Sequence, residues 1–237
     1  MICEIIGKGL GYSSEEINAL SYEGLESRIA GTVNSIEDNP LLKAVAGAVA
    51  EAGPWGASME QVARRSGLSK SSLYCHFRSR RDMLYQLFMT ESLRIIGFAR
   101  QGMGRSEAAH EQLYLGIFSV AEYLRSKPDI LVALDWIRNR RLEIGPHGDT
   151  DQADQANPKC KGPLTESLLL FDELDIRTLK NGENPFRGIQ ISHWILFLIV
   201  TTLMRENQGQ KTLGYVSNSD IRCLYRFLTL GIKGFKT

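Results

Sequence analysis

This sequence has no apolar stretch long enough to cross a membrane and too few cysteines for a disulfide framework. Its longest apolar run, residues 193–204, is shorter than the about 20 residues that a membrane-spanning helix needs. No signal-type cleavage site follows the first residues. The four cysteines are too widely spaced for a metal knuckle or a redox pair: Cys3, Cys75, Cys160 and Cys223. We therefore expect a cytoplasmic protein with free thiols and no membrane segment.

The short motifs of common enzyme classes are also missing. The sequence contains no Gly-x-Ser-x-Gly, no His-Glu-x-x-His, no Walker motif and no dinucleotide fingerprint. Three of its four histidines, His110, His147 and His193, are scattered, whereas a metal site needs them gathered. We expect a protein that is not an enzyme and that holds neither a metal nor a cofactor.

Charge is nearly balanced over the whole chain but is unevenly distributed along it. The net charge is +1, so any nucleic-acid surface has to be local. Residues 1–39 hold two basic and seven acidic side chains, a net charge of −5. Residues 56–82 hold six basic and two acidic side chains, a net charge of +4. A local basic excess of this kind favours contact with phosphates, and a merely solvated basic face is the alternative.

The apolar pattern predicts an all-α fold without a convincing strand. Several local signals mark helix ends: Asn39-Pro40 a start, Gly53-Pro54 a stop, and residues 58–61 a capping box. A short helical face is also expected within residues 17–33, and a loop at 145–163, where prolines recur. The main helices are expected at 41–52, 59–65, just after Ser69, 80–100, 107–126, 129–144, 164–179, 186–207 and 219–235.

Residues 57–77, ASMEQVARRSGLSKSSLYCHF, fit a helix-turn-helix. Ala63 is the small residue needed where the helices touch, Gly67 is the glycine needed in the turn, and three apolar residues can face the core: Val62, Leu68 and Leu73. The second helix then exposes mostly polar side chains: Ser69, Lys70, Ser71, Ser72, Tyr74 and His76. A single exposed helix fits the DNA major groove, and its free N-terminal N–H groups suit a phosphate.

The stretch 41–88 resembles the N-terminal DNA-binding domain of the TetR (tetracycline-repressor) family of transcriptional regulators. Besides the alanine-rich first helix and the break at Gly53, the matching residues are Ala57, Ser58, Met59, Val62, Ala63, Gly67, Leu68, Ser69, Lys70, Leu73, Tyr74, His76, Phe77, Arg80 and Leu84. The resemblance implies an all-α fold in which a larger helical domain binds a ligand and dimerises. We expect a helix-turn-helix domain at 40–88, a ligand-binding and dimerisation domain at 89–237, and an extra acidic, helical extension at 1–39.

The resemblance also implies roles for single residues. Ser58, Tyr74, His76 and Arg80 correspond to phosphate contacts, and Arg64 adds a further one. Lys70, Ser71 and Ser72 correspond to the positions that face the groove, with Ser69 as the helix cap. Cys75 is expected to be a small packed residue, with a redox role as the remote alternative.

Several large apolar side chains of the larger domain are candidates for a mainly apolar ligand pocket. They are Phe98, Met103, Tyr114, Phe118, Trp136, Phe171 and Trp194, and for each one alone core packing is the alternative. The helices at 186–207 and 219–235 are expected to form a homodimer, because the apolar residues at 194–204 need a partner.

The function expected from the resemblance is a ligand-responsive transcriptional regulator, a repressor in the commoner case and an activator in the other. It would bind a pseudopalindromic double-stranded DNA operator as a homodimer and be released by a small-molecule effector. The alternative is a helical partner-binding protein of the same fold that does not bind DNA. Three roles are open for residues 1–39: packing on the dimer, covering the basic face, or adding a helical appendage.

Overall fold

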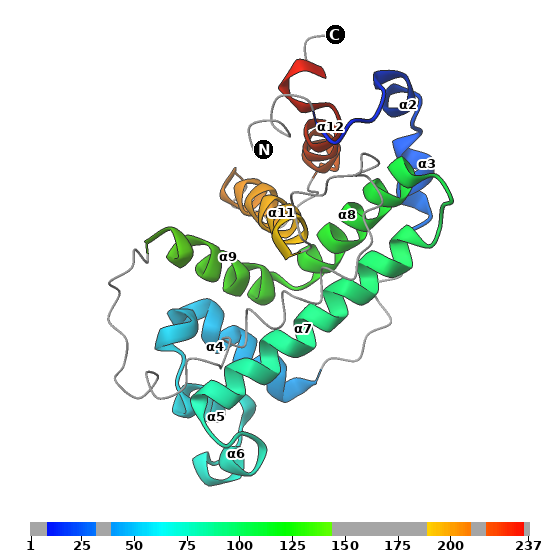
Figure 1. The fold of residues 1–237 in the computed structure, drawn as a ribbon. Coiled ribbons are helices and arrows are strands. Elements are labelled where there is room, and N and C mark those ends of the chain that lie inside the picture. The colour runs from blue at the N-terminus through cyan, green and yellow to red at the C-terminus, as the bar shows by residue number, and fades with distance from the viewer. Residues whose placement is uncertain (1–8, 32–38, 144–188, 210–216, 235–237) are drawn as a thin grey trace. The chain divides into compact units, whose positions relative to one another are not determined.

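The computed structural model describes residues 9–31, 39–143, 189–209 and 217–234, and within these ranges it is helical without a strand (Figure 1). The all-α prediction is therefore confirmed. The helix expected at 164–179, the loop at 145–163 and Phe171 lie outside the described residues. No helix in the described ranges is both long and apolar enough to span a bilayer.

The described helices divide into two compact units. Unit 1 contains α2 (Ser14–Asn18), α3 (Tyr22–Ser27), α8 (Ala109–Ser126), α11 (Ile189–Gly209) and α12 (Ser219–Gly234). Unit 2 contains α4 (Pro40–Gly56), α5 (Met59–Ser66), α6 (Lys70–His76) and α9 (Pro128–Glu143). Helix α7 (Arg80–Met103) begins in unit 2 and ends in unit 1.

Helix α4 starts and breaks where its sequence predicts. The side chain of Asn39 accepts hydrogen bonds from the first backbone N–H groups, and Pro40 occupies the first helical position. At Gly53 the backbone leaves the helix, with φ 73° and ψ 165°. Only glycine adopts this region readily, so the break is encoded locally.

Helix α9 packs on α4 within unit 2. Alanine and valine dominate the buried face of α4, and α9 contributes Ile130, Leu131 and Leu134 to the same core. The indole ring of Trp136 covers Gly53, since a Cβ added there would lie 3.3 Å from two of its ring carbons. The break in α4 is thus fixed from outside by a side chain that lies 83 positions away in the sequence.

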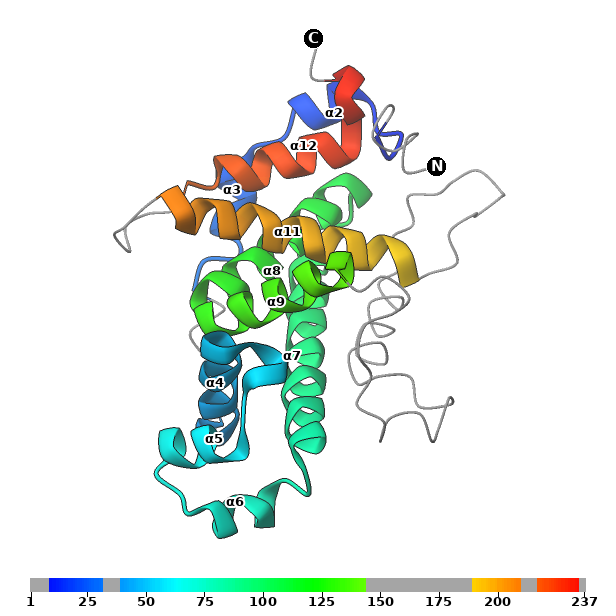
Figure 2. The same cartoon turned by 90° about the vertical axis from the view of Figure 1, so that its left-hand side faces the viewer.

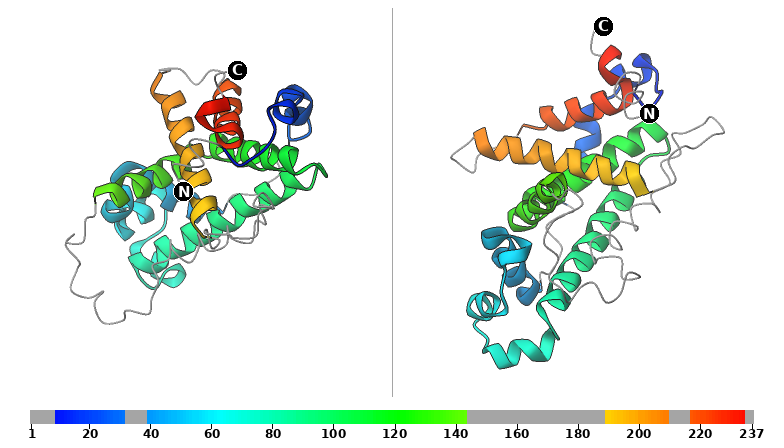
Figure 3. Two further views of the ribbon diagram at one scale, coloured as in Figure 1. Left: turned by 45° about the horizontal axis from the view of Figure 1, so that its top comes forward. Right: turned by 60° about the vertical axis from the view of Figure 1, so that its left-hand side comes forward.

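Unit 1 is built around α8, whose residues 113–121 are all buried. Helices α11 and α12 pack on α8 and on each other, and they run side by side in Figures 2 and 3. The N-terminal extension forms α2 and α3, which pack on α12 and α8 respectively. The described part of the extension, residues 9–31, therefore contains two helices and belongs to unit 1.

Replacing Gly53 with alanine should lower the free energy of unfolding by about 1–3 kcal/mol, because alanine is strained at this φ and ψ and its Cβ meets the Trp136 ring. Chemical denaturation measures the change. Gly97→Ala is the matched control, since Gly97 is helical and exposed with open space around it. That control should be neutral or stabilising, and equal losses in the two variants would contradict the explanation.

Candidate nucleic-acid interface

Helices α5 and α6 form the predicted helix-turn-helix. Ser58 and Gln61 make the expected capping box, in which Ser58 Oγ accepts from the Gln61 N–H at 3.2 Å and Gln61 Oε1 accepts from the Ser58 N–H at 2.8 Å. Gly67 ends α5 in the left-handed conformation, with φ 71°. The turn is closed by the Leu68 N–H, which donates to the Ala63 carbonyl at 3.0 Å.

The core of this motif differs at two residues from the one that the sequence predicts. Val62 and Leu73 are fully buried and Ala63 nearly so, as expected, and Phe77 joins them. Leu68 is instead 37% exposed, so the prediction that it faces the core was wrong. It follows Gly67 directly, and the left-handed turn there directs the chain outward before α6 begins.

Helix α6 presents almost all of its polar side chains to solvent. Its N-cap is Ser69, whose Oγ accepts from the Ser72 N–H at 3.0 Å, as predicted. Lys70, Ser71 and Ser72 are exposed beside it. Only Leu73 is buried within α6. The other sides of the helix are exposed, as a helix that enters the major groove of DNA requires.

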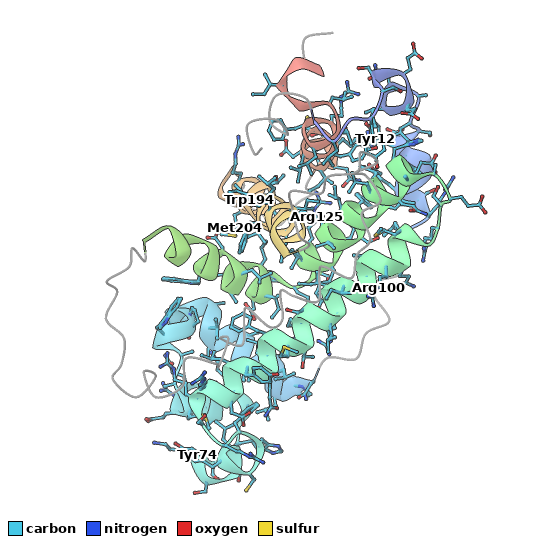
Figure 4. The ribbon with its side chains drawn as sticks, viewed as in Figure 1. Tyr12, Tyr74, Arg100, Arg125, Trp194 and Met204 are labelled. Atoms are coloured by element: carbon cyan, nitrogen blue, oxygen red, sulfur yellow. The ribbon has the colours of Figure 1, made fainter. Side chains whose placement is uncertain are left out.

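The second turn of α6 carries the aromatic and imidazole side chains of the motif. Tyr74 is 50% exposed (Figure 4), and His76 is also exposed. Cys75 is exposed as well, so the prediction of a packed cysteine was wrong. Its thiol lies 3.7 Å from the Ser71 carbonyl one turn earlier, which is a contact within the helix itself.

The basic side chains of the motif have different surroundings. Arg64, Lys70 and Arg78 are exposed. Arg65 instead forms an ion pair with Glu51 of α4, and its hydrogen bond holds the pKa of that carboxyl below the usual range. A Cβ added at Gly47 would lie 2.8 Å from the Arg65 Nη1. Arg65 therefore links α5 to α4, whereas the other three are open to a phosphate.

Arg80 holds the segment between α4 and α5. Its Nε donates to the Ala57 carbonyl at 2.8 Å, and its Nη2 donates to the Pro54 carbonyl at 2.7 Å. Both carbonyls lie just beyond the break at Gly53, where the helix no longer supplies N–H partners. These bonds use two of the five N–H groups of the guanidinium. Its predicted phosphate contact stays a prediction, but its position in the fold is set by these carbonyls.

Arg78, which was not among the predicted phosphate contacts, is exposed as a phosphate contact needs to be. Arg78 lies between α6 and α7, and its backbone N–H donates to Asp82 Oδ2 at 2.8 Å. That bond involves only the backbone of Arg78, and its side chain is exposed. The local charge excess at residues 56–82 included Arg78, so the signal was present in the sequence.

The candidate pocket residues that the structure describes divide between the two units. Phe98, Tyr114 and Phe118 are buried in unit 1, where Phe98 stacks on Tyr123 and Tyr114 stacks on Phe118. Met103 lies against Gly116. Trp136 belongs to unit 2, and Trp194 on α11 is 51% exposed (Figure 4). A ligand pocket made of these residues stays a prediction.

The exposed side of α11 carries several large apolar side chains together with the polar Thr201, Thr202 and Arg205. Trp194 is half exposed, and Phe197, Leu198 and Met204 are partly exposed along the same helix. The neighbouring helix α12 adds partly exposed Phe227. Large apolar side chains at a surface suggest a protein contact.

Comparison with known proteins confirms the resemblance found in the helix-turn-helix. Residues 41–87 match the model of the N-terminal domain of bacterial regulatory proteins of the tetR family. The sequence matches no curated protein.

Solved structures of similar fold extend over most of the chain. The transcriptional regulator FadR from Bacillus subtilis, in complex with stearoyl-CoA, aligns with a TM-score of 0.56 and 17% identity over 81% of this chain and 98% of its own. The fatty acid degradation regulator FadR from Bacillus halodurans gives 0.57 and 16%, over 80% and 96%. A TetR family transcription regulator from Marinobacter aquaeolei VT8 gives 0.54 and 16%, over 87% and 94%. At these identities the likeness is one of fold.

Replacing Arg80 with glutamine should destabilise the protein by about 1–3 kcal/mol, because the carbonyls of Pro54 and Ala57 lose charged hydrogen-bond donors. Arg80→Lys should restore little of this loss, since one ammonium cannot reproduce the fork. Denaturant unfolding measures both. Arg78→Gln is the control, and it should change the stability by less than about 0.5 kcal/mol; a comparable loss there would contradict the assignment.

Proposed function

We propose that this protein, whose residues 41–87 match the tetR-family N-terminal domain, is a ligand-responsive transcriptional regulator that binds a DNA operator as a homodimer. The observation that carries the proposal is α6 itself. Helix α6 is anchored by Leu73 and exposes a lysine, two serines, a tyrosine and a histidine, with exposed arginines at positions 64 and 78 on either side of it.

The proposed assignment of residues to base contacts and to phosphate contacts follows from side-chain chemistry. Lys70, Ser71 and Ser72 face the major groove, where hydroxyl groups both donate and accept and therefore select bases only weakly. Ser58, Arg64, Tyr74, His76 and Arg80 seat the domain on phosphates, and we add Arg78 to this set. Contacts to phosphate fix the register, and contacts to base edges specify the sequence.

A homodimer is the proposed form that binds DNA. The apolar side chains that α11 exposes, together with α12, suit an isologous contact with a second copy. A two-fold pair of helix-turn-helix motifs reads half-sites about 34 Å apart, which is one turn of DNA. The expected operator is accordingly a near-palindrome.

The proposed effector is a small, mainly apolar molecule. Its binding shifts α7, which begins directly after the helix-turn-helix at Arg80. The distance between the two helix-turn-helix motifs of the dimer then no longer matches one turn of DNA. Linkage requires that the effector bind the two states with different affinities. One protein of similar fold was solved with stearoyl-CoA. A long-chain acyl-CoA, whose acyl chain is apolar but whose CoA part is large and charged, is therefore a second kind of compound to test beside small apolar molecules. Repression is the proposed direction.

A partner-binding protein of the same fold that does not contact DNA is the second candidate. The acidic extension, with a net charge of −5 over residues 1–39, favours it. The net charge of +4 over residues 56–82 favours DNA. Binding to genomic fragments at low salt separates the two, because only the regulator retains fragments with a common sequence.

Replacing Lys70 or Tyr74 with alanine should weaken operator binding by about 1–3 kcal/mol each, because each removes a direct contact from α6. The operator comes from selection of bound fragments of the source genome. Fluorescence anisotropy against salt concentration then gives the affinity and its salt slope for each variant.

Arg100→Gln controls for the loss of one positive charge, since Arg100 is an exposed residue near the other end of α7. It should bind the operator as the unchanged protein does. Equal losses for Lys70→Ala and Arg100→Gln would indicate a general charge effect. No binding by the unchanged protein at low salt would favour the partner-binding candidate.

Replacing Trp194 with aspartate should weaken the dimer by about 2 kcal/mol or more, because a buried aromatic anchor at an interface would become a charge. Sedimentation equilibrium of the free protein measures the dimer dissociation constant. Trp55→Asp is the matched control, since Trp55 is 48% exposed and Trp194 is 51% exposed. A dimer that Trp194→Asp leaves intact would place the interface elsewhere.

A further inference from the structure

A partly buried carboxylate joins the N-terminal extension to the helices of unit 1. Glu26 of α3 accepts hydrogen bonds from Tyr114 of α8 at 2.5 Å and from the Asn218 amide at 2.7 Å. Arg222 of α12 donates to the same carboxylate from Nε at 2.7 Å and from Nη2 at 3.0 Å. One side chain therefore takes four hydrogen bonds from two other parts of the unit, and the Arg222 contact is of the bidentate kind.

The titration of these groups agrees with the geometry. Burial acts to raise the pKa of the Glu26 carboxyl, but the hydrogen bonds from Arg222, Tyr114 and Asn218 outweigh it and hold that pKa below the usual range. Burial and then the neighbouring Glu26 raise the pKa of the Tyr114 hydroxyl. The carboxylate is thus charged and the phenol protonated, which is the combination that the hydrogen bond needs.

Apolar and aromatic contacts surround this network. The ring of Tyr22 lies 5.0 Å from that of Tyr114 and 6.3 Å from that of Tyr225, edge to face in both cases. The Arg222 guanidinium stands 5.4 Å above the Tyr22 ring. Ile17, Leu25 and Ile29 of the extension are at most 2% exposed. The extension therefore buries its apolar side chains within the unit and does not merely touch it.

The other end of the extension closes the end of α12. Inside α12 the backbone leaves the helix at Gly231, with φ 64°, so the carbonyls of the preceding turn lack helical partners. The Leu10 N–H donates to the carbonyls of Leu228 at 2.9 Å and Thr229 at 3.1 Å. Beside it, Gly9 approaches so closely that an added Cβ would lie 2.1 Å from the Thr229 oxygen. Only glycine fits this contact.

We infer that residues 9–29 are an N-terminal clasp that holds α12 on α8 through Glu26 at one end and Leu10 at the other. Because α12 is half of the proposed dimer bundle, the clasp also keeps the α11–α12 pair in the arrangement that dimerises. This second step rests on the proposed function. The extension is then a structural part of the dimerisation unit. Its carboxylates Glu23 and Glu26 pair with Arg222, and the neutral amide oxygen of Asn18 accepts a hydrogen bond from Arg226.

Gly9 and Gly11 offer a matched pair of variants for the test. Both have positive φ, 67° and 85°, so alanine is strained at either position. An added Cβ meets backbone atoms at Gly9 and open space at Gly11. Hydrogen exchange of the full chain, read by mass spectrometry, should be about ten-fold faster in α12 and in residues 9–29 for Gly9→Ala than for Gly11→Ala. Exchange in α9, which belongs to unit 2, is the internal reference.

Glu26→Gln is the second variant, with the exposed Glu15→Gln as its control. Glu26→Gln keeps the shape of the side chain but removes the charge of the less exposed of the two carboxylates that pair with Arg222, so that Arg222 retains the exposed Glu23 as its charged partner. It should speed exchange in the same two segments and raise the dimer dissociation constant in sedimentation by about ten-fold or more. Tyr114→Phe, which removes a single hydrogen bond, serves the same purpose if Glu26→Gln does not fold.

The outcomes separate the two steps. Equal exchange in each variant and its control overturns the clasp. Faster exchange in residues 9–29 with an unchanged α12 overturns its hold on α12, and faster exchange in α12 with an unchanged dimer overturns its part in dimerisation. If exchange changes as expected while the unchanged protein binds no DNA, the proposed function fails and the clasp stands.

Discussion

The position of the helix-turn-helix depends on the pair of hydrogen bonds that Arg80 donates to the carbonyls of Pro54 and Ala57. Helix α4 ends at Gly56, one turn after its break at Gly53, and a helix end leaves carbonyls without helical partners. A guanidinium from the start of α7 satisfies two of them and so fixes the point from which α5 departs. Ser58 caps α5 immediately afterwards, and α6 follows through a single left-handed turn at Gly67. The orientation of the exposed face of α6 depends on this sequence of constraints.

Unit 1 uses the same physical device at Glu26. There too one charged side chain collects hydrogen bonds from segments far apart in the chain, in this case from Tyr114, Asn218 and Arg222. A partly buried charge of this kind is costly to leave unpaired, which makes the arrangement specific even where its net contribution to stability is small. One such centre orients the helix-turn-helix, and the other joins the extension to the helices proposed to dimerise.

Most of the local structure could be predicted from the sequence, because its signals act over a few residues. The caps at Asn39, Ser58 and Ser69, the break at Gly53 and the turn at Gly67 are all confirmed. The errors concern exposure. Leu68 and Cys75 were expected to be packed and are exposed, because burial depends on which neighbours arrive from other helices. The sequence also did not predict which basic side chains have partners within the protein. Arg65 is paired with Glu51, and Arg80 donates to backbone carbonyls. Arg64 and Arg78 are exposed.

The sequence by itself determined the helical fold, the helix-turn-helix and the resemblance that the tetR-family model confirms over residues 41–87. Periodicity, capping and turn chemistry are local, and a short motif carries them completely. Only the tertiary structure decided where the acidic extension lies, because Glu26 and Arg222 are 196 positions apart and either could pair with many charges. It also decided that Trp136 covers Gly53. Contacts between distant segments are selected by the packing of the whole chain, and no local pattern records them.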